Sequence, residues 1–257
     1  MPEGTAAILN ARSLETSHRR LAELLRPGLR VLDVGCGTGA ITSGIAHAVA
    51  PRGRVVGVDV NPDLVAEACR LHGRVPGLSF QVADAWSLPF HEAFDIVTAA
   101  RLLQWLAQPG DAVRALARAA RPGGRLVVLD YNHEKIAWTP PPPPSVQAFY
   151  AAFLKWRTDA GMDNAIADHM AALFAQAGLQ KVAVTPQHET TRRGEPGFET
   201  QAGIWADVAA TRGCQMVEDG VIAEADRAGA ETDYRAWIRH GAEVQTMYLL
   251  AVESVRP

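Results

Sequence analysis

The chain has 257 residues, 48% of them apolar, with a formal net charge of −3 and a pI near 6.2. This size permits one sizeable core with an appended part, and the weak negative charge argues against a nucleic-acid partner. Three cysteines without close pairing indicate a reducing compartment, and the eight scattered histidines show no metal-site spacing. We see no signal-peptide pattern and no run of about 18 apolar residues for a membrane span. We therefore expect a cytoplasmic protein without membrane contact.

The first predicted element is a helix over residues 7–26. Its leucines recur on one face, and the Pro-Gly pair at 27–28 ends the run. Its basic residues Arg19 and Arg20 fall outside the apolar face, as expected for an amphipathic helix that covers a core.

The segment RVLDVGCGTGAIT (30–42) predicts a buried strand over 30–35, a glycine-rich turn, and a helix over about 39–50. This unit brings a ligand close to backbone N–H groups at a helix N-terminus. Gly35, Gly37 and Gly39 are needed because a Cβ there would strike the ligand or forbid a positive φ. We interpret Cys36 as a small residue that fits the turn.

The next predicted strand, 54–59, ends at Asp59. A carboxylate at this tip can accept hydrogen bonds from both hydroxyls of a ribose. Val60 follows it, where an apolar side chain would lie against adenine. Gly35-x-Gly37-x-x-Ala40 also satisfies the loose dinucleotide-binding pattern, so these features alone do not name the cofactor.

Three further strands are predicted over 78–83, 94–99 and 125–130, with a helix over about 110–120 between the last two. Ligands collect at the carboxyl ends of such strands, near the reversal of strand order. The segment 101–105 should therefore border the reacting group. Tyr131 stands at the tip of the last of these strands.

Two segments leave this pattern. Pro140 to Pro144 predicts a stiff extended spacer, and 145–157 is amphipathic, with an aromatic stripe that is either core or a lid facing the substrate. A return helix and strand are expected over about 168–185. The predicted organisation is a core over 1–131, 168–185 and 244–257, the last being its closing strand, with insertions over 132–167 and 186–243.

The strings VLDVGCGTG, VVGVDVNPDLV, VADAWSLPF, FDIVTAARLLQWL and RPGGRLVVLDY, in this order, resemble class I S-adenosylmethionine-dependent methyltransferases. They are most similar to the small-molecule branch that includes the ubiquinone/menaquinone-biosynthesis enzymes (methyltransferase type 11). The resemblance covers 29–131 closely and 168–185 loosely. It implies an α/β fold, a doubly wound seven-stranded Rossmann-like sheet, with an α-helical cap formed by the insertions.

The resemblance also implies a site for S-adenosyl-L-methionine. Asp84 and the Ala85 N–H would read adenine, and Trp86 would either wall the adenine or merely pack. Asp33 would hold the loop or lie near the methionine amine, while Arg12 and His18 are possible contacts of the methionine carboxylate. The predicted cofactor residues are Arg12, Asp33, Gly35, Cys36, Gly37, Gly39, Asp59, Val60, Asp84, Ala85, Trp86, Arg101 and Leu102.

The implied function is methyl transfer to an oxygen, nitrogen or carbon of a small organic molecule. Tyr131, His133 and His169 are the candidates for a general base. A NAD-dependent oxidoreductase and a non-catalytic S-adenosylmethionine-binding module are the alternatives. A nucleic-acid methyltransferase is disfavoured because the chain lacks an Asn/Asp-Pro-Pro-aromatic motif after the fourth strand. The sequence leaves open whether the protein is a monomer or a homodimer.

Overall fold

The computed structural model describes residues 9–10 and 12–257, which form two compact units. The core unit contains the described residues up to Tyr131, together with Ala165–Gln187 and Leu249–Pro257. The inserted unit contains Asn132–Asn164 and His188–Tyr248. Within the described residues, no helix combines the length and apolar character needed to cross a membrane.

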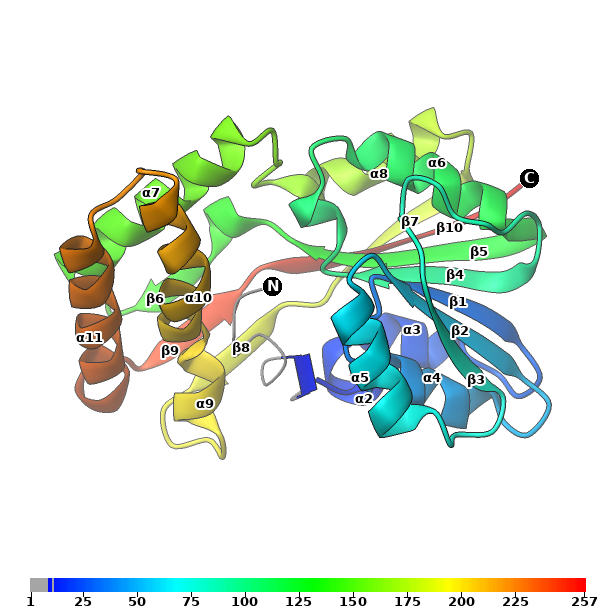
Figure 1. Ribbon diagram of the computed structural model, residues 1–257, viewed down its shortest axis with the longest axis horizontal. Coiled ribbons are helices and arrows are strands. Elements are labelled where there is room, and N and C mark those ends of the chain that lie inside the picture. Colours follow the sequence, from blue (N-terminus) through cyan, green and yellow to red (C-terminus); the bar gives the residue numbers. More distant parts are fainter. Residues whose placement is uncertain (1–8, 11) are drawn as a thin grey trace. The chain divides into compact units, whose positions relative to one another are not determined.

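The core unit is built on a seven-stranded sheet of order β3-β2-β1-β4-β5-β10-β7 (Figure 1). Neighbouring strands among the first five are parallel, whereas β10 runs antiparallel to both β5 and β7. The order reverses at β1, between β2 and β4, which confirms the predicted doubly wound sheet. The bounds are β1 (Arg30–Val34), β2 (Arg54–Asp59), β3 (Leu78–Val82), β4 (Phe94–Ala100), β5 (Ala120–Tyr131), β7 (Gln180–Pro186) and β10 (Leu249–Val255).

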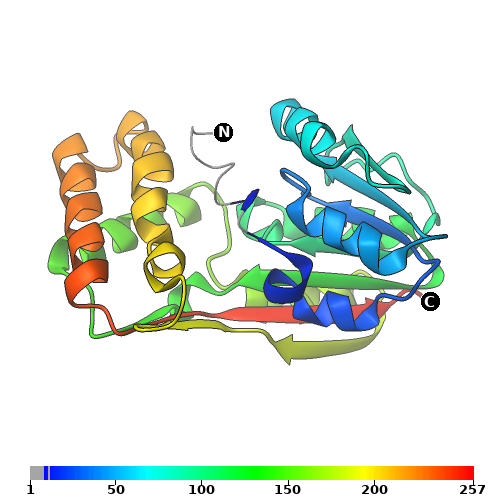
Figure 2. The ribbon, with the colours of Figure 1, turned by 90° about the horizontal axis from the view of Figure 1, so that it is seen from below.

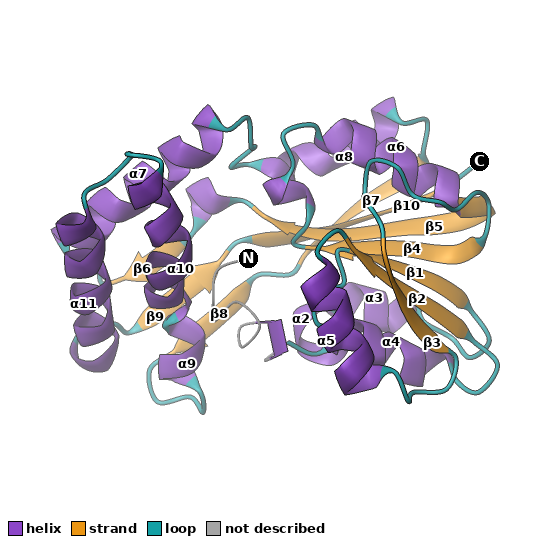
Figure 3. Ribbon diagram, viewed as in Figure 1, coloured by secondary structure: helices purple, strands orange, loops and turns teal. Residues whose placement is uncertain are grey.

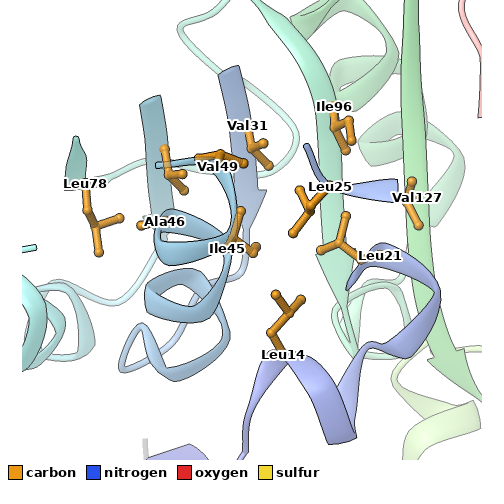
Figure 4. Close-up of a cluster of buried hydrophobic side chains, with 11 residues drawn as sticks. Leu14, Leu21, Leu25, Val31, Ile45, Ala46, Val49, Leu78, Ile96 and Val127 are labelled. Atoms are coloured by element: carbon orange, nitrogen blue, oxygen red, sulfur yellow. The ribbon is translucent and has the colours of Figure 1, made fainter. Parts of the chain in front are cut away.

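Helices cover both faces of this sheet (Figures 1 and 3). One face carries α2 (Leu14–Ser17), α3 (Arg19–Leu24), α4 (Ala40–Val49) and α5 (Pro62–His72). The other carries α6 (Pro109–Ala119) and α8 (Ile166–Gln176), and the 3-10 helix η1 (Leu103–Trp105) follows β4. Buried side chains of α2, α3 and α4 pack on β1, β4 and β5, as Figure 4 shows for Leu21, Ile45, Val31, Ile96 and Val127.

The inserted unit is helical in large part, as expected of the cap, and it also contains strands. It holds a three-stranded antiparallel sheet of β6 (Ala137–Thr139), β9 (Val244–Met247) and β8 (Glu189–Arg192), with β9 in the middle. Such strands of three or four residues are too short to show an apolar alternation in the sequence. The helices are η2 (His133–Lys135), α7 (Pro144–Asp159), α9 (Phe198–Ala202), α10 (Ile204–Glu218) and α11 (Glu224–His240), and α10 lies beside α11 (Figure 2).

The predicted closing strand over 244–257 is also wrong as a single element. The chain changes sheets at Tyr248: β9 pairs with β6 and β8 in the inserted unit, and β10 pairs with β5 and β7 in the core unit. One uninterrupted stretch of chain thus serves two sheets. The sequence pattern does not show this change because the two strands are separated by a single residue, Tyr248.

The leading segment is not one continuous helix. Part of the predicted 7–26 range (residues 7, 8 and 11) lies outside the described residues, and the rest of it contains α2 and α3, which are separated at His18 (φ −151°, ψ 57°). This break directs the buried His18 ring into the sheet, where its Nε2 lies 3.0 Å from Thr98 Oγ1. The Thr98 hydroxyl donates its proton to Val127 O at 2.7 Å, so Nε2–H of His18 must be the donor of the other bond.

The buried His18 predicts a loss of stability in acid. Burial, followed by the positive charge of Arg101, lowers the pKa of His18 from 6.5 to about 3. Between these values the unfolded chain binds a proton that the native state excludes, so the free energy of unfolding falls as the pH falls. We expect His18 to contribute a loss of about 2 kcal/mol between pH 7.5 and 5.0.

Urea unfolding at both pH values tests this. Between these pH values, the free energy of unfolding should fall by about 2 kcal/mol less in His18→Gln than in the wild type. Replacing the exposed His91 by Gln is the control, and this variant should lose as much stability as the wild type. Equal pH dependence of wild type and His18→Gln would contradict the prediction.

Candidate cofactor site

The glycine-rich turn between β1 and α4 adopts a backbone that requires glycine. Gly35, Gly37 and Gly39 have φ values of 76°, 54° and 80°, in the left-handed region that side chains rarely adopt. A Cβ on Gly39 would also lie 2.7 Å from Phe80 Cζ. The N–H groups of Gly35 and Cys36 donate to Val58 O at 2.8 and 2.9 Å, so the turn is fixed to the end of β2.

Asp59 lies against this turn, as the sequence predicts for a ribose-binding carboxylate. Its Oδ2 accepts the N–H of Gly37 at 2.9 Å, and its Oδ1 accepts the N–H of Asn61 at 3.0 Å. The side chain is half-buried, and an ionised carboxylate has about four acceptor positions. Asp59 is thus oriented by the backbone and keeps acceptor capacity for a ligand.

Apolar side chains are exposed at the carboxyl ends of β2 and β3. Val60, Val82 and Trp86 have 66%, 53% and 42% of their surface exposed. Val82 pairs in register with Asp59, so the apolar surface and the carboxylate are neighbours. An exposed apolar surface beside an oriented carboxylate suits a flat ring attached to a diol.

Asp84 has a structural role in this arrangement. Its Oδ1 accepts the N–H of Trp86 at 2.9 Å and its O accepts the N–H of Ser87 at 3.1 Å, which is an Asx turn after β3. Trp86 donates its indole N–H to Gln108 O at 3.2 Å. Asp84 and Ala85 are both half-buried, and their contact with adenine remains a prediction.

Asp33 is a buried acid beneath the turn. It is 4% exposed, and Thr42 Oγ1 donates to its Oδ2 at 2.6 Å. Burial is the main reason that its pKa rises to about 7, with the hydrogen bond from Thr42 opposing the shift and the charge of Asp59 adding to it. Asp33 therefore links β1 to α4, and its contact with the methionine amine remains a prediction.

A small cavity of about 20 Å³ opens beside Asp33 and the turn. Arg12, Cys36 and Thr38 line it. Burial, with the charges of Asp33 and Asp59, raises the pKa of the Cys36 thiol, so Cys36 is not a reactive thiolate. The fully buried Thr38 hydroxyl has no hydrogen-bond partner within the described part of the chain, which marks a position where a ligand atom would satisfy it.

Arg101 and Leu102 follow β4 and differ in what they contact. Arg101 is 5% exposed; its Nε donates to Tyr131 Oη at 2.7 Å and its Nη1 to Ser17 O at 3.1 Å. It therefore joins the end of β5 to α2. Leu102 lies over the turn, since a Cβ on Gly35 would be 3.0 Å from its Cδ1.

The three base candidates occupy different environments. Tyr131 is buried and bonded to Arg101, and His169 lies on α8 with an exposed side chain. His133 belongs to the inserted unit, where it is 4% exposed and packs edge-on against Phe153 and Trp205. Burial and the charge of Arg157 hold the pKa of His133 well below its ordinary value. A catalytic role for any of them remains a prediction.

Three residues of the site were missed in the sequence. Thr42 supplies the hydrogen bond to Asp33, Thr38 supplies the unpaired hydroxyl, and Val82 extends the apolar surface. Only Val82 had a sequence signal, because it is an apolar residue at the end of a predicted strand, close to the turn at Asp84. The threonines act through tertiary contacts that no spacing rule shows.

Comparison with known proteins supports the resemblance. Residues 32–128 match a family model described as a methyltransferase domain. The ubiquinone/menaquinone biosynthesis C-methyltransferase UbiE of Shewanella frigidimarina is 38% identical over 114 residues, 43% of this chain and 45% of that protein. The chain thus matches less than half the length of this relative.

Solved structures share the fold at low sequence identity. Phosphoethanolamine N-methyltransferase 2 of Haemonchus contortus, in complex with S-adenosyl-L-methionine, gives a TM-score of 0.57 at 17% identity over 93% of this chain and 52% of that chain. A putative methyltransferase of Bacillus halodurans gives 0.58 at 19% identity over 98% and 99%. Residues 32–128 thus match a methyltransferase domain, and the chain shares the fold of these solved methyltransferases.

Proposed function

We propose that this chain transfers a methyl group from S-adenosyl-L-methionine to an oxygen, nitrogen or carbon of a small organic molecule. The observation that carries the proposal is the bond between Asp59 and the N–H of Gly37 in a turn of three left-handed glycines. This bond holds a carboxylate, which would accept the ribose hydroxyls, beside the glycine turn at the N-terminus of α4. The methyltransferase-domain match over the same residues supports it.

The nucleoside end of the cofactor would lie along the tips of β2 and β3. Asp59 would accept hydrogen bonds from the ribose hydroxyls, and Val60 and Val82 would contact the adenine ring. Asp84 and the Ala85 N–H would bind the adenine edge, with Trp86 beside them. The exposure of these three apolar side chains supports the assignment, because a bound ring would remove them from water.

The methionine end would lie at the small cavity beneath the turn. Arg12 would bind the carboxylate and Asp33 the ammonium group, next to the unpaired Thr38 hydroxyl. A bound ammonium favours the ionised form of Asp33, whose pKa of about 7 reflects its burial. Gly35, Gly37, Gly39 and Cys36 would form the wall of the site, with Leu102 packed over Gly35.

The sulfonium of the cofactor makes its methyl group electrophilic, so the protein's main contribution is alignment and exclusion of water. Alignment of the acceptor with the C–S bond lowers such a barrier by about 7–11 kcal/mol. Arg101 contributes by holding the tip of β5 and α2 together. An oxygen or nitrogen acceptor that carries a proton needs a base, for which Tyr131, His133 and His169 are the proposed residues.

Ligand binding separates the proposal from its alternatives. In calorimetry and thermal-shift measurements, S-adenosylhomocysteine should bind and raise the melting temperature, whereas NAD should do neither. Stabilisation by NAD alone would identify an oxidoreductase. A mass-spectrometric screen of small metabolites with S-adenosyl-L-methionine should then find one that gains a methyl group; if none does so while the cofactor binds, the chain is a non-catalytic module.

A further inference from the structure

The inserted unit contains a cavity of about 360 Å³. All its lining residues belong to this unit, and they come from α7, α10, α11 and the segment before α7. Small-molecule sites usually have volumes of about 300–1,000 Å³. The cavity is therefore large enough for a ring compound, and none of the proposed cofactor residues lines it.

The walls of the cavity are aromatic rings that hold one another in place. Trp138 and Trp205 both pack edge-on against Tyr150, with centroids 5.1 and 4.7 Å away and interplanar angles of 84°. Phe149 and Tyr234 complete the aromatic lining. Because these rings are already fixed, a ligand would not have to order them on binding.

The lining offers no charge to a ligand. Among the described residues that line the cavity, none is acidic or basic. The two phenols are bonded within the protein, since Tyr150 Oη donates to His133 O at 2.5 Å and Tyr234 Oη donates to Ala202 O at 2.7 Å. Burial raises the pKa of both phenols, so they stay neutral. A charged group would enter at a high desolvation cost and without a counter-ion.

One of the lining residues, Trp205, has an unsatisfied polar atom. Trp205 is 5% exposed, and its indole N–H has no hydrogen-bond partner in the described part of the chain. The indole of Trp138, by contrast, donates to Tyr234 Oη at 3.3 Å. A buried donor without an acceptor is rare in a folded protein and is expected where a ligand supplies the acceptor.

We propose that this cavity binds a neutral, mostly apolar ring compound that carries one carbonyl or ether oxygen. The rings of Trp138, Phe149 and Tyr150 contact its apolar body, and the indole N–H of Trp205 donates to its oxygen. This site goes beyond the proposed function, because no proposed cofactor residue forms it. The compound that binds there is either the methyl acceptor or a ligand of another kind.

The probe for the test is 6-propionyl-2-(dimethylamino)naphthalene, a neutral naphthalene ketone whose emission shifts to the blue in apolar surroundings. It should bind the intact chain and quench tryptophan emission, while the charged 8-anilinonaphthalene-1-sulfonate should bind at least about tenfold more weakly. Ala230 is buried in α11 and lines the cavity, so a larger side chain at this position would fill part of the cavity. Ala230→Leu should weaken the ketone about tenfold or more.

Two further variants complete the test. Ala225→Leu adds the same side chain at an exposed position of α11 and should leave binding unchanged. Trp205→Phe keeps a ring but removes the N–H, and should weaken the ketone about three- to tenfold. Circular dichroism establishes that each variant is folded. Absence of ketone binding, or equal binding by the wild type and Ala230→Leu, would overturn the proposal.

A final experiment shows whether the compound bound in the cavity is the methyl acceptor. Neutral ring ketones and phenols that displace the probe are incubated with S-adenosyl-L-methionine and analysed by mass. Displacement with methylation identifies the cavity as an acceptor site, and displacement without methylation identifies a ligand of another kind; both support the cavity. S-adenosylhomocysteine is titrated separately, so a chain that binds the ketone but not this product loses the proposed function and keeps the cavity.

Discussion

Replacing Asp59 by alanine should weaken S-adenosylhomocysteine binding about 30- to 1000-fold, a loss of about 2–4 kcal/mol. The carboxylate would accept two hydrogen bonds from the ribose diol, each worth about 1.5–3 kcal/mol, and water replaces part of that in the variant. Calorimetric titration of the wild type and the variant measures the difference. Because Asp59 lies half-buried at a strand tip, its removal opens no cavity inside the sheet.

The hydrogen bonds of Asp59 within the protein require a second measurement. The carboxylate also accepts the N–H groups of Gly37 and Asn61, so the variant should lose about 1–3 kcal/mol of stability as well. Asp63→Ala is the matched control, since Asp63 is an exposed acid in the first turn of α5. It should retain cofactor affinity. A change in affinity below about threefold for Asp59→Ala, with a lowered melting temperature, would show that Asp59 only holds the turn.

The parts of the fold that the sequence predicted well are those whose signals are local. Buried parallel strands are nearly continuous apolar runs, so the strand ending at Asp59 was placed with its observed bounds. The glycine turn was predictable because positive φ at Gly35, Gly37 and Gly39 leaves few alternatives to glycine. These two features alone placed Asp59 opposite the turn, where the structure has it; its role as the ribose acceptor stays a prediction.

The parts that the sequence did not predict depend on distant contacts. His18 reads as one member of an amphipathic helix, yet its ring breaks that helix to reach Thr98, 80 positions away. The segment 101–105 was predicted to border the reacting group, which stays a prediction, but the sequence did not show that the Arg101 guanidinium is bonded to Tyr131 and Ser17. The spacing of residues in a sequence shows which of them lie at the end of a strand, but it does not show which groups a long side chain contacts.

The aromatic stripe of α7 shows the same limit, because the sequence left it as either core or lid. In the structure Phe149, Phe153 and Trp156 are 6%, 1% and 8% exposed. Phe153 packs against the rings of Trp156 and Trp205, and Trp156 donates its indole N–H to Asp219 Oδ2 at 2.8 Å. The stripe is therefore the core of the inserted unit, although Phe149 also faces the cavity.

Phe153→Ala should therefore lower the free energy of unfolding by about 3–5 kcal/mol, the usual cost of emptying a fully buried aromatic site. It should leave the affinity for S-adenosylhomocysteine unchanged, because all the proposed cofactor residues belong to the core unit. Urea unfolding and calorimetry measure the two quantities on the same protein. Lys155→Ala on the same helix is the control: its side chain is 72% exposed and pairs with Asp159, an exposed ion pair worth about 0–1 kcal/mol. If Phe153→Ala is as stable as the wild type but transfers methyl groups more slowly, the lid interpretation is correct. The loss of a buried core side chain would lower stability as well as turnover.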